Sequence, residues 1–424
     1  MLKRIFYIFL VFISIKAVGQ RTNSSPYSFF GIGQQFASQT VEEASMGGVG
    51  ISYSDFYHLN FMNPAGLANL RFSTFSIGAT ANKLSIKDVS GSQSSTSTNL
   101  SYVSLGFPIG DNSGMSVGLQ PNSSVGYSLL STVNDANGEI MEGTRFFGTG
   151  GTNRVFANYG RFLTKNLSLG VEIEYIFGNV ENNILNQRAN VQLATKNEEE
   201  TSLRGGGIKF GLQYKKLLAS KLNIYAGAVV KLENSLSTSG TEHLFSLTIE
   251  NSEISRDTLY SGSVDGKVTR PLRTGVGFGI GKTGKWYTGI EYEFQSAMKI
   301  NGSLLSQNAG YAFGDSNKFS VGGFYLPKAN SITSYWDRVI YRAGVRFEKT
   351  GLLVKNTSNG FTEINDFGIS FGLGLPLRDL SNVNLGIEYG KKGSTQNNLI
   401  QENYFNFRLS LSLTDKWFQK RKID

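Results

Sequence analysis

The chain has 424 residues, a formal net charge of +9 and no cysteine. Without cysteine it can form no disulfide, no thiolate metal site and no lipid-attachment site. Three of its basic residues, Lys3, Arg4 and Lys16, precede the part expected to be exported, and the remaining charge of +6 is too small to indicate a nucleic-acid partner. The 30 phenylalanines and 19 tyrosines against seven prolines favour a protein made of sheet.

Residues 1–19 predict a secretory signal peptide. Two basic residues precede an apolar run from Ile5 to Ile15, and Ala17-Val18-Gly19 offers the small side chains of a cleavage site before Gln20. The apolar run is too short to cross a bilayer as a helix. No long apolar run follows it, which excludes a helical membrane protein. A membrane barrel is not excluded, because its strands carry outward apolar residues only at every second position.

Residues 20–70 show no convincing alternation and predict a compact N-terminal hatch, or plug. Gly47 and Gly48 lie in irregular backbone, after one short helix expected near Thr40 to Met46. Asn63-Pro64-Ala65-Gly66 predicts a turn near the end of the hatch. Regular structure is therefore expected to start at about residue 71.

Strict alternation of apolar and polar residues begins at Phe72. Between Leu167 and Phe177 every odd position is apolar, whereas the even positions include Glu172 and Glu174. A period of two over about ten residues means a strand with two different faces. Fourteen such segments follow one another. They begin near Phe72, Asn99, Gly114, Asn153, Leu167, Leu203, Leu222, Arg270, Lys285, Lys318, Arg338, Ile364, Asn382 and Glu402.

The connections between these segments indicate an orientation. Those after the second, fourth, sixth, eighth and twelfth segments are short, the tenth (Pro327 to Asp337) is long, and the longest of all runs from Asn234 to Thr269. Short periplasmic turns with longer outer loops are typical of outer-membrane barrels. This topology puts Trp286, Trp336 and Trp417 at the periplasmic interface, as an aromatic belt requires.

Together these patterns predict an all-β protein, a 14-stranded antiparallel transmembrane β-barrel formed by residues 71–414. The hatch of residues 20–70 would lie inside its lumen, and residues 415–424 would form a periplasmic tail. In lipid, only a closed sheet satisfies every backbone N–H and C=O group. We therefore expect the barrel in the outer membrane of a Gram-negative cell, in contact with membrane lipid and with both mature termini in the periplasm.

The inward faces of the predicted strands carry ionisable residues. One interpretation is a polar path or a gate. The other is a buried network of ion pairs and hydrogen bonds that holds the hatch and fills the lumen, because unpaired charges there would be costly. The residues are Glu172, Glu174, Glu291, Glu293 and Glu388, together with Lys209, Lys231, Arg342 and Arg346.

Two further features attract attention outside the hatch. The predicted outer loops contain Phe146, Phe147, Leu244 and Phe245, which loops do not need. Exposed apolar patches mark a hydrophobic ligand or a protein partner, although these side chains can equally pack on each other as a cap. Pro121 interrupts the third predicted strand and cannot donate to a ladder, so it predicts either a kink with a gap in the wall or a simple bulge.

Nothing in the sequence indicates catalysis. It contains two histidines, His58 and His243, and neither lies in a nucleophile motif. The stretch from Gly279 to Lys285 fits the first part of a phosphate-binding loop, but Trp286 stands where Ser or Thr must hold the metal, and a strand follows instead of a helix. We expect no enzyme, no metal and no cofactor.

The hatch resembles a known family. Gly31-Ile-Gly33, Ala44-Ser-Met-Gly47-Gly48, Asn60 and Asn63-Pro64-Ala65, followed at once by the first strand, are similar to the N-terminal hatch of FadL-type long-chain fatty-acid and hydrocarbon transporters. The fourteen strands agree with this family. The opening Ser25 to Gly33 and the closing Trp417 to Ile423 resemble the version found in Bacteroidetes-type bacteria.

The resemblance implies passive uptake of a hydrophobic small molecule. The molecule would be caught by outer loops, pass the hatch and leave sideways into the membrane at the kinked third strand. Asn63, Pro64 and Ala65 would then lie near that kink, at Pro121. Relatives of this barrel type also imply an alternative, an accessory or scaffold subunit of an outer-membrane protein complex for secretion or barrel assembly. A plain diffusion pore is a third alternative, which the long N-terminal segment disfavours.

Overall fold

The computed structural model describes residues 23–415, except for Ser90 and the ranges 250–252, 303–309, 356–359 and 378–379. The predicted signal peptide, Trp417 and the tail from residue 416 onward lie outside the described residues. Within the described part of the chain, no helix is both long and apolar enough to cross a lipid bilayer.

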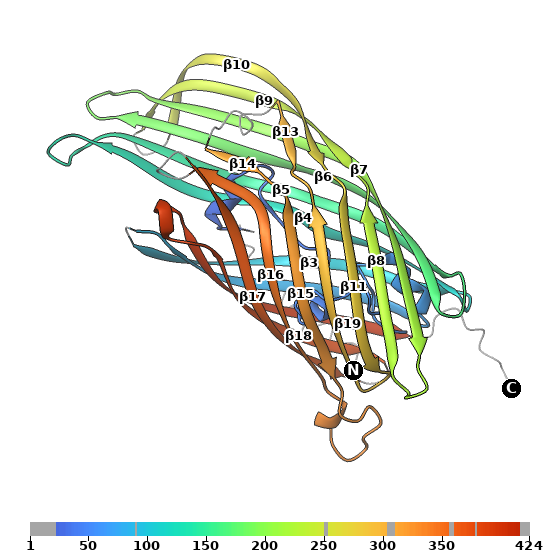
Figure 1. Cartoon of the computed structure of the whole chain (residues 1–424). Coiled ribbons are helices and arrows are strands. Elements are labelled where there is room, and N and C mark those ends of the chain that lie inside the picture. The colour runs from blue at the N-terminus through green and yellow to red at the C-terminus, as the bar shows by residue number, and fades with distance from the viewer. Residues whose placement is uncertain are drawn as a thin grey trace, which may run out of the picture.

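Fourteen antiparallel strands close into one barrel, which confirms the predicted fold class (Figure 1). Four of the fourteen are interrupted, and each of these consists of two consecutive segments. Their bounds are β2 (Ser73–Lys87), β3 (Ser92–Ile109), β4 (Ser113–Asn134), β5 (Ile140–Phe162), β6 (Leu167–Arg188), β7 (Ala194–Leu217), β8 (Asn223–Lys231) with β9 (Asn234–Ile249), β10 (Glu253–Arg270) with β11 (Arg273–Lys282), β12 (Trp286–Gln295) with β13 (Lys299–Asn301), β14 (Tyr311–Phe313) with β15 (Ser316–Tyr325), β16 (Ile340–Lys355), β17 (Phe361–Pro376), β18 (Asn382–Gly393) and β19 (Gln401–Asp415). Pairing of β19 with β2, from Gln401 opposite Lys87 to Asp415 opposite Ser73, closes the barrel.

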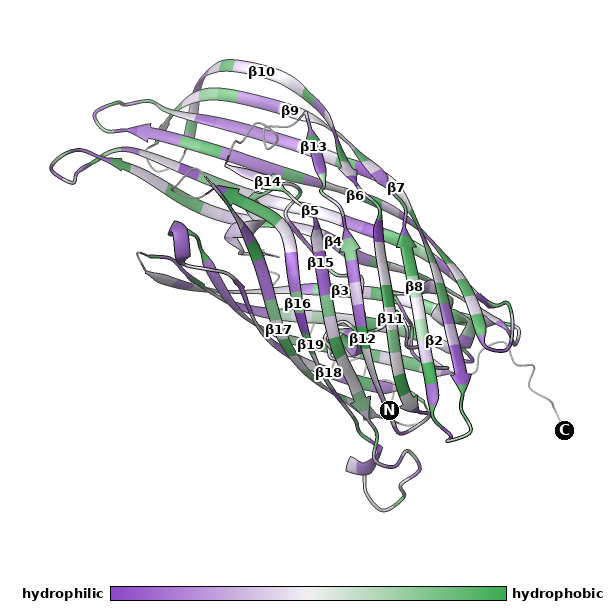
Figure 2. Ribbon diagram, in the orientation of Figure 1, coloured by the Kyte–Doolittle hydropathy of each residue, from purple (hydrophilic) through white to green (hydrophobic). Residues whose placement is uncertain are grey.

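The two faces of the wall differ as the alternation predicts. In β6 the inward Glu172 is buried, whereas its outward neighbour Ile173 is 61% exposed. Figure 2 shows the same alternation of hydrophobic and hydrophilic positions along the strands of the front wall. Apolar side chains on the outside and polar ones inside are the reverse of a soluble barrel and suit a wall surrounded by lipid.

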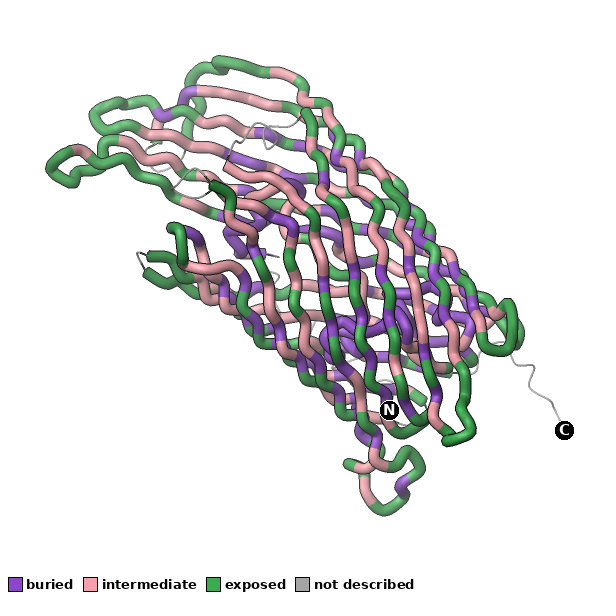
Figure 3. The backbone as a smooth tube through the Cα atoms, viewed as in Figure 1, coloured by how far each residue is buried: buried purple, intermediate pink, exposed green. Residues whose placement is uncertain are grey.

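The described residues before β2 form an N-terminal segment inside the barrel. It contains two 3-10 helices, η1 (Pro26–Phe29) and η2 (Pro64–Asn69), the two-residue strand β1 (Gln34–Gln35) and one helical turn, α2 (Val41–Ala44). The helix η2 packs on β4 to β7, whereas α2 packs on β17 to β19, on another part of the wall. The segment therefore crosses the lumen, where Figure 3 shows a concentration of buried residues.

Local sequence explains the turn structure around α2. Thr40 caps the helix: its side chain accepts from the backbone N–H of Glu43, and the Glu43 carboxylate accepts from the N–H of Thr40, which is a capping box. Gly47 follows with φ of +70°, in the left-handed region that favours glycine. A Cβ atom there would lie 2.7 Å from the Val345 backbone nitrogen of β16. Glycine thus lets the segment touch the wall.

The barrel is taller on one side than on the other. Where long outer loops were predicted, β4 to β7, β9 and β10 run on as strands and form an extension beyond the rest of the wall, visible at the upper left of Figure 1. The predicted loop from Asn234 to Thr269 is in fact mostly the hairpin of β9 and β10. Alternation fails to reveal such strands, because both of their faces can be polar in water.

Candidate functional site in the barrel lumen

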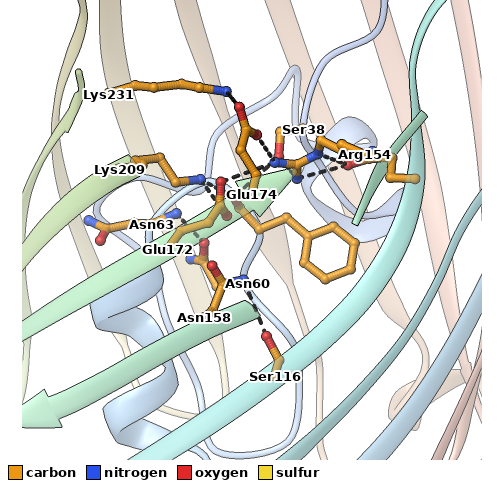
Figure 4. A network of polar contacts seen from close by, with 12 residues as sticks. Ser38, Asn60, Asn63, Ser116, Arg154, Asn158, Glu172, Glu174, Lys209 and Lys231 are labelled. Carbon is orange, nitrogen blue, oxygen red and sulfur yellow. Dashed lines mark hydrogen bonds and ion pairs between the residues drawn. The ribbon is translucent and has the colours of Figure 1, made fainter. Parts of the chain in front are cut away.

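The first cluster of lumen charges lies on β5 to β8 (Figure 4). Nη1 of Arg154 lies 3.0 Å from one carboxylate oxygen of Glu172 and 2.9 Å from one of Glu174. Nζ of Lys209 lies 3.0 Å from Glu172, and Nζ of Lys231 lies 2.5 Å from Glu174. All five side chains are largely buried. Each carboxylate is therefore neutralised from two sides.

Strand register brings this cluster together. Glu172 lies directly opposite Lys209 in the pairing of β6 with β7, and Lys209 lies opposite Lys231 in the pairing of β7 with β8. Buried ion pairs repay the cost of desolvation only with good geometry and further hydrogen bonds. Arg154 supplies such bonds, because its Nε and Nη2 donate to the side-chain oxygen of Gln120.

The same cluster holds the N-terminal segment. Nζ of Lys209 donates to the backbone oxygen of Phe61 at 2.8 Å. Nη2 of Arg154 donates to the hydroxyl of Ser38. The lumen charges thus bond to the wall and to the segment at once.

A second cluster lies on the opposite stretch of wall, on β16 to β19. Arg346 donates to Glu388 at 2.9 Å, to Glu348 at 2.8 Å and to Asp366 at 3.0 Å. Its Nη2 also donates to the hydroxyl of Tyr404, and Arg408 pairs with the second oxygen of Glu388. One arginine at the centre of several acceptors is again a satisfied network.

Three of the predicted lumen residues have other partners. Glu293 pairs with Arg273, at 2.7 Å, and with Lys318. Among the described residues Glu291 forms no ion pair; its carboxylate instead accepts the backbone N–H groups of Gly50 and Ser52, at 3.1 and 3.0 Å. Arg342 donates to the side-chain oxygen of Asn384 at 3.0 Å. The lumen therefore combines ion pairs with hydrogen bonds to the segment.

Asparagines hold the part of the segment from Val41 to Leu70, its lower half, in place. Asn60 donates to the backbone oxygens of Gly50 and Tyr53, at 2.7 and 2.8 Å. Asn63 accepts from the N–H of Ala65 at 3.0 Å and donates to the oxygen of Ile51 at 2.8 Å. The Asn63 amide also donates to the Leu212 oxygen of β7, at 3.1 Å. Gly47 donates its N–H to the Ser370 hydroxyl of β17 at 2.9 Å, whereas Gly48 follows with φ of +79°.

The expectation that Asn63, Pro64 and Ala65 lie near Pro121 does not agree with the structure. Cβ atoms built at Gly170 and Gly211 would meet these three residues, which places them against β6 and β7. Other parts of the segment lie beside Pro121. The Phe36 N–H donates to the Asn122 oxygen at 3.0 Å, and Gln120 donates to the Ala37 oxygen at 3.2 Å.

At Pro121 the wall has both a bulge and a gap. The pairing of β4 with β5 shifts register between Pro121 and Ser123, which is the bulge. The pairing of β3 with β4 runs only from Ile109 opposite Ser113 to Val103 opposite Leu119. Above that point β1 pairs with β4 instead, Gln34 opposite Ser124 and Gln35 opposite Ser123.

The start of the described chain enters this gap. The amide of Asn23 donates to the Ser124 oxygen of β4 at 3.1 Å, and the hydroxyl of Ser24 bonds to that of Ser95 on β3 at 2.6 Å. The chain thus joins both sides of the gap with polar bonds. It also means that the described chain starts beside the middle of β4, whereas β19 ends at the end of the barrel with the short turns.

A cavity of about 420 Å³ remains between the segment and the wall. Nine basic and six acidic side chains line it, among them Arg154, Arg270, Glu293 and Arg346. It reaches the gap, where Ser97 and other hydroxyl and amide side chains of β2 and β3 face it. The space inside the barrel is therefore rich in charged groups, and apolar side chains such as Met62 and Val229 line it as well.

Two carboxyl groups of the segment have shifted pKa values. Burial raises the pKa of Glu43 to about 8, against the lowering effect of hydrogen bonds from the backbone of Thr40 and Phe61. Burial also acts to raise the pKa of Asp55, but the charge and hydrogen bonds of His58 outweigh it and hold that pKa at about 2. His58 lies 2.6 Å from Asp55, so it serves the packing of the segment; the other histidine, His243, lies in β9.

The four apolar residues predicted in outer loops all lie in strands and do not form one site. Phe146 of β5 packs on Phe29 of the segment, with ring centroids 5.9 Å apart, so it faces inward. The strand register places Leu244 of β9 in line with Phe146 across β6 and β7, so Leu244 lies on the same face as Phe146. Phe147 and Phe245 lie on the other face, where Nζ of Lys196 sits over both rings. Strand alternation thus divides the four residues between two faces.

Several charged residues of the site escaped the sequence analysis. Arg154, Arg270, Arg273, Lys318 and Arg408 all pair with the predicted glutamates. The alternation of inward and outward residues could have identified Arg154, because it directly precedes the outward Val155 in a predicted strand. Arg270 and Arg273 flank the interruption at Pro271, where the alternation of inward and outward residues cannot be followed from one segment to the next.

Comparison with known proteins shows which family and which solved structures this barrel is similar to. The model of the BamG family matches residues 1–424. A comparison with curated proteins found no match. The toluene transporter TodX of Pseudomonas putida is 15% identical, with a TM-score of 0.59 over 91% of this chain and 99% of that one. A FadL homologue of Pseudomonas aeruginosa is 12% identical, with a TM-score of 0.59 over 91% and 99%.

A third solved structure gives the same picture. The toluene transporter TbuX of Ralstonia pickettii is 13% identical, with a TM-score of 0.57 over 89% of this chain and 98% of that one. At such identities the likeness shows a shared fold. The resemblance to FadL-type barrels, expected from the hatch motifs, is thereby confirmed.

Proposed function

The chain belongs to the BamG family, and we propose that it is a structural, non-transporting subunit of a larger outer-membrane protein complex. The name of the matched family, BamG, points to a complex, and of the two kinds of machinery considered above we propose barrel assembly. In this role the barrel provides a rigid membrane-embedded body, and other proteins dock on its surfaces.

One observation carries this proposal: the route that a hydrophobic molecule would need is occupied and polar. Lys209, Arg154 and Glu291 bond to the N-terminal segment from different strands. Moving the segment aside would break these bonds and leave buried charges without partners, which costs free energy. The cavity that remains is lined by fifteen charged side chains as well as apolar ones, so a hydrocarbon chain that entered it would displace hydrating water from charged groups.

The gap at β4 supports the same conclusion. Lateral release would need an apolar exit into the membrane, but Asn23 and Ser24 bond across the gap to Ser124 and Ser95. On the lumen side the gap is bordered by hydroxyl and amide side chains. A molecule leaving by this route would have to break polar contacts that it cannot replace.

The second candidate is uptake of a hydrophobic, fatty-acid-like molecule with lateral release. The fold is that of FadL-type barrels, and solved structures of that fold include toluene transporters. The interrupted pairing of β3 with β4 supports this candidate, as does an apolar cluster in the upper lumen that includes Ile32, Val125 and Tyr127. Phe29 packs on that cluster, with its ring centroid 5.0 Å from that of Tyr127.

The deciding experiment is purification of the tagged chain from its own outer membrane in mild detergent, followed by native mass spectrometry. The structural role predicts stoichiometric outer-membrane protein partners and a barrel free of apolar small molecules. A barrel that arrives alone and carries a fatty acid or hydrocarbon would overturn it in favour of uptake. A matched control is the variant Arg154→Met, which removes the central cation of the lumen network. If the barrel transports a ligand, the amount of ligand bound to this variant should change, whereas partners docked on the outside should remain bound.

A further inference from the structure

The upper part of β4 has one edge that faces the gap. Backbone groups of alternate residues point there: Asn122 accepts from Phe36 at 3.0 Å, and Ser124 accepts from Asn23 at 3.1 Å. The N–H of Gly126 donates to the Ser28 hydroxyl at 3.1 Å. Up to Gly126, therefore, the edge is covered by the N-terminal segment of the same chain.

Beyond Gly126 the same edge continues without a partner among the described residues. The pairing of β4 with β5 is regular from Ser123 to Val133, so the backbone groups of Ser128, Leu130 and Thr132 point into the gap as well. No hydrogen bond of the described chain reaches these groups, and β3 pairs with β4 only up to Leu119. The side chains of these residues are exposed as well, that of Leu130 to 71%.

This edge lacks the features by which proteins protect free edges. The stretch from Ser123 to Val133 contains no charged residue and no proline, and its ladder has no bulge before Val133. Short strands, charges, prolines and bulges normally discourage pairing with another chain. The strand at the other side of the extension, β10, shows such protection: it has register shifts at Ser255/Asp257 and Thr258/Tyr260 and carries Arg256.

The length of β4 predicts that this edge lies beyond the lipid. A tilted strand needs about nine to eleven residues to cross the hydrocarbon layer. Counted from Ser113, that length ends close to Ser123, so Ser128 to Thr132 stand beyond the membrane on the side of the extension. That side faces outward in outer-membrane barrels, because their short turns lie in the periplasm.

We propose that the edge of β4 from Ser128 to Thr132 accepts an extended, uncharged segment of a partner protein at the cell surface as an added strand. The chain already pairs with β4 in this way immediately below Gly126, where β1 lies antiparallel to Ser123 and Ser124. Pairing by main-chain hydrogen bonds at a free edge is a general mode of protein recognition. β3 lies on the far side of the gap and pairs with β4 only from Val103 to Ile109. The inference rests on the proposed structural role and names the surface that role would use.

The test separates backbone pairing from side-chain contact at one position. Leu130→Pro removes an N–H that points into the gap but leaves the ladder with β5 intact, whereas Leu130→Ala keeps the N–H and removes only the side chain. Both variants are purified as full-length chains from the native outer membrane, and co-purified partners are quantified. We expect Leu130→Pro to lower the recovery of one partner about tenfold and Leu130→Ala to change it less than about twofold.

A photo-reactive residue at Thr132 identifies the occupant in intact cells. Cross-links to one segment of that same partner support the proposal, whereas cross-links to a second copy of this chain or to its own N-terminus overturn it. Equal losses for the proline and alanine variants would mean side-chain docking and would also overturn it. If the wild-type chain brings down no partner, the proposed function fails with the inference. If partners remain bound to Leu130→Pro, only the inference fails.

Discussion

The two halves of the N-terminal segment differ in how far they are buried in the lumen. The lower half, from Val41 to Leu70, is held by buried polar groups, such as Asn63 and the backbone oxygen of Phe61 that meets Lys209. The upper half, from Asn23 to Gln35, combines polar bonds to the wall, such as that of Asn23 to Ser124, with the half-buried ring of Phe29, which packs edge-on against Tyr127 with centroids 5.0 Å apart. Breaking a buried polar bond leaves an unsatisfied group, whereas a displaced ring loses only its contacts and burial. The lower half should therefore be part of the barrel's stability, and the upper half should be able to move separately.

The largest effect is expected from the arginine that serves both wall and segment. Arg154→Met removes the partner shared by Glu172 and Glu174 and should cost about 3–5 kcal/mol of unfolding free energy, because it leaves buried carboxylates short of neutralising charge. Urea unfolding in detergent, followed by tryptophan fluorescence, measures this. Adding Glu174→Gln should recover part of the loss; a double variant as unstable as the sum of the two single variants would contradict the shared network.

The next largest effect concerns the lower half alone. Asn63→Ala removes an acceptor and a donor at a fully buried site and should cost about 2–3 kcal/mol. Asn69→Ala is the matched control at the other end of η2, whose N-cap is Asn63; it removes one partly buried bond, to Ser54, and should cost about 1 kcal/mol or less. Similar losses for both variants would show that the lower half is not fixed through Asn63.

A smaller effect is expected from the upper half. Phe29→Ala removes the ring contacts with Tyr127 and Phe146 and should cost about 1 kcal/mol of global stability. Hydrogen exchange should nevertheless rise strongly between Asn23 and Gly33 and stay unchanged between Val41 and Leu70. If exchange rose in both halves together, the segment would move as one unit and the comparison would fail.

The smallest effect depends on pH. The pKa of Glu43 is raised to about 8 in the folded chain, so the folded state binds more protons than the unfolded state between the ordinary glutamate value and pH 8. Stability should therefore fall as pH rises through this window. Glu43→Gln keeps a neutral side chain at all pH values and should flatten that part of the profile. Melting curves in detergent at pH 5 and pH 8 test this, and an unchanged slope would contradict it.

Much of the barrel could be predicted from the sequence, because alternation is a local property. Each of the fourteen predicted segments corresponds to one strand of the closed sheet. The inward placement of Glu172, Glu174 and Glu388 followed from the same parity, and the structure buries all three. The extension was missed because strands in water need no apolar face, so the period-two signal disappears where the wall leaves the lipid.

The sequence by itself determined the strand number, the lipid-facing and inward faces and the presence of a separate N-terminal segment, since these depend on residues close in the chain. Only the tertiary structure decided which charge meets which, that Asn63 lies against β7 rather than beside Pro121, and that β4 parts from β3 above Leu119. Those features depend on strand register and on the path of the segment through the lumen. Both are set by contacts between residues far apart in the chain, which local periodicity does not record.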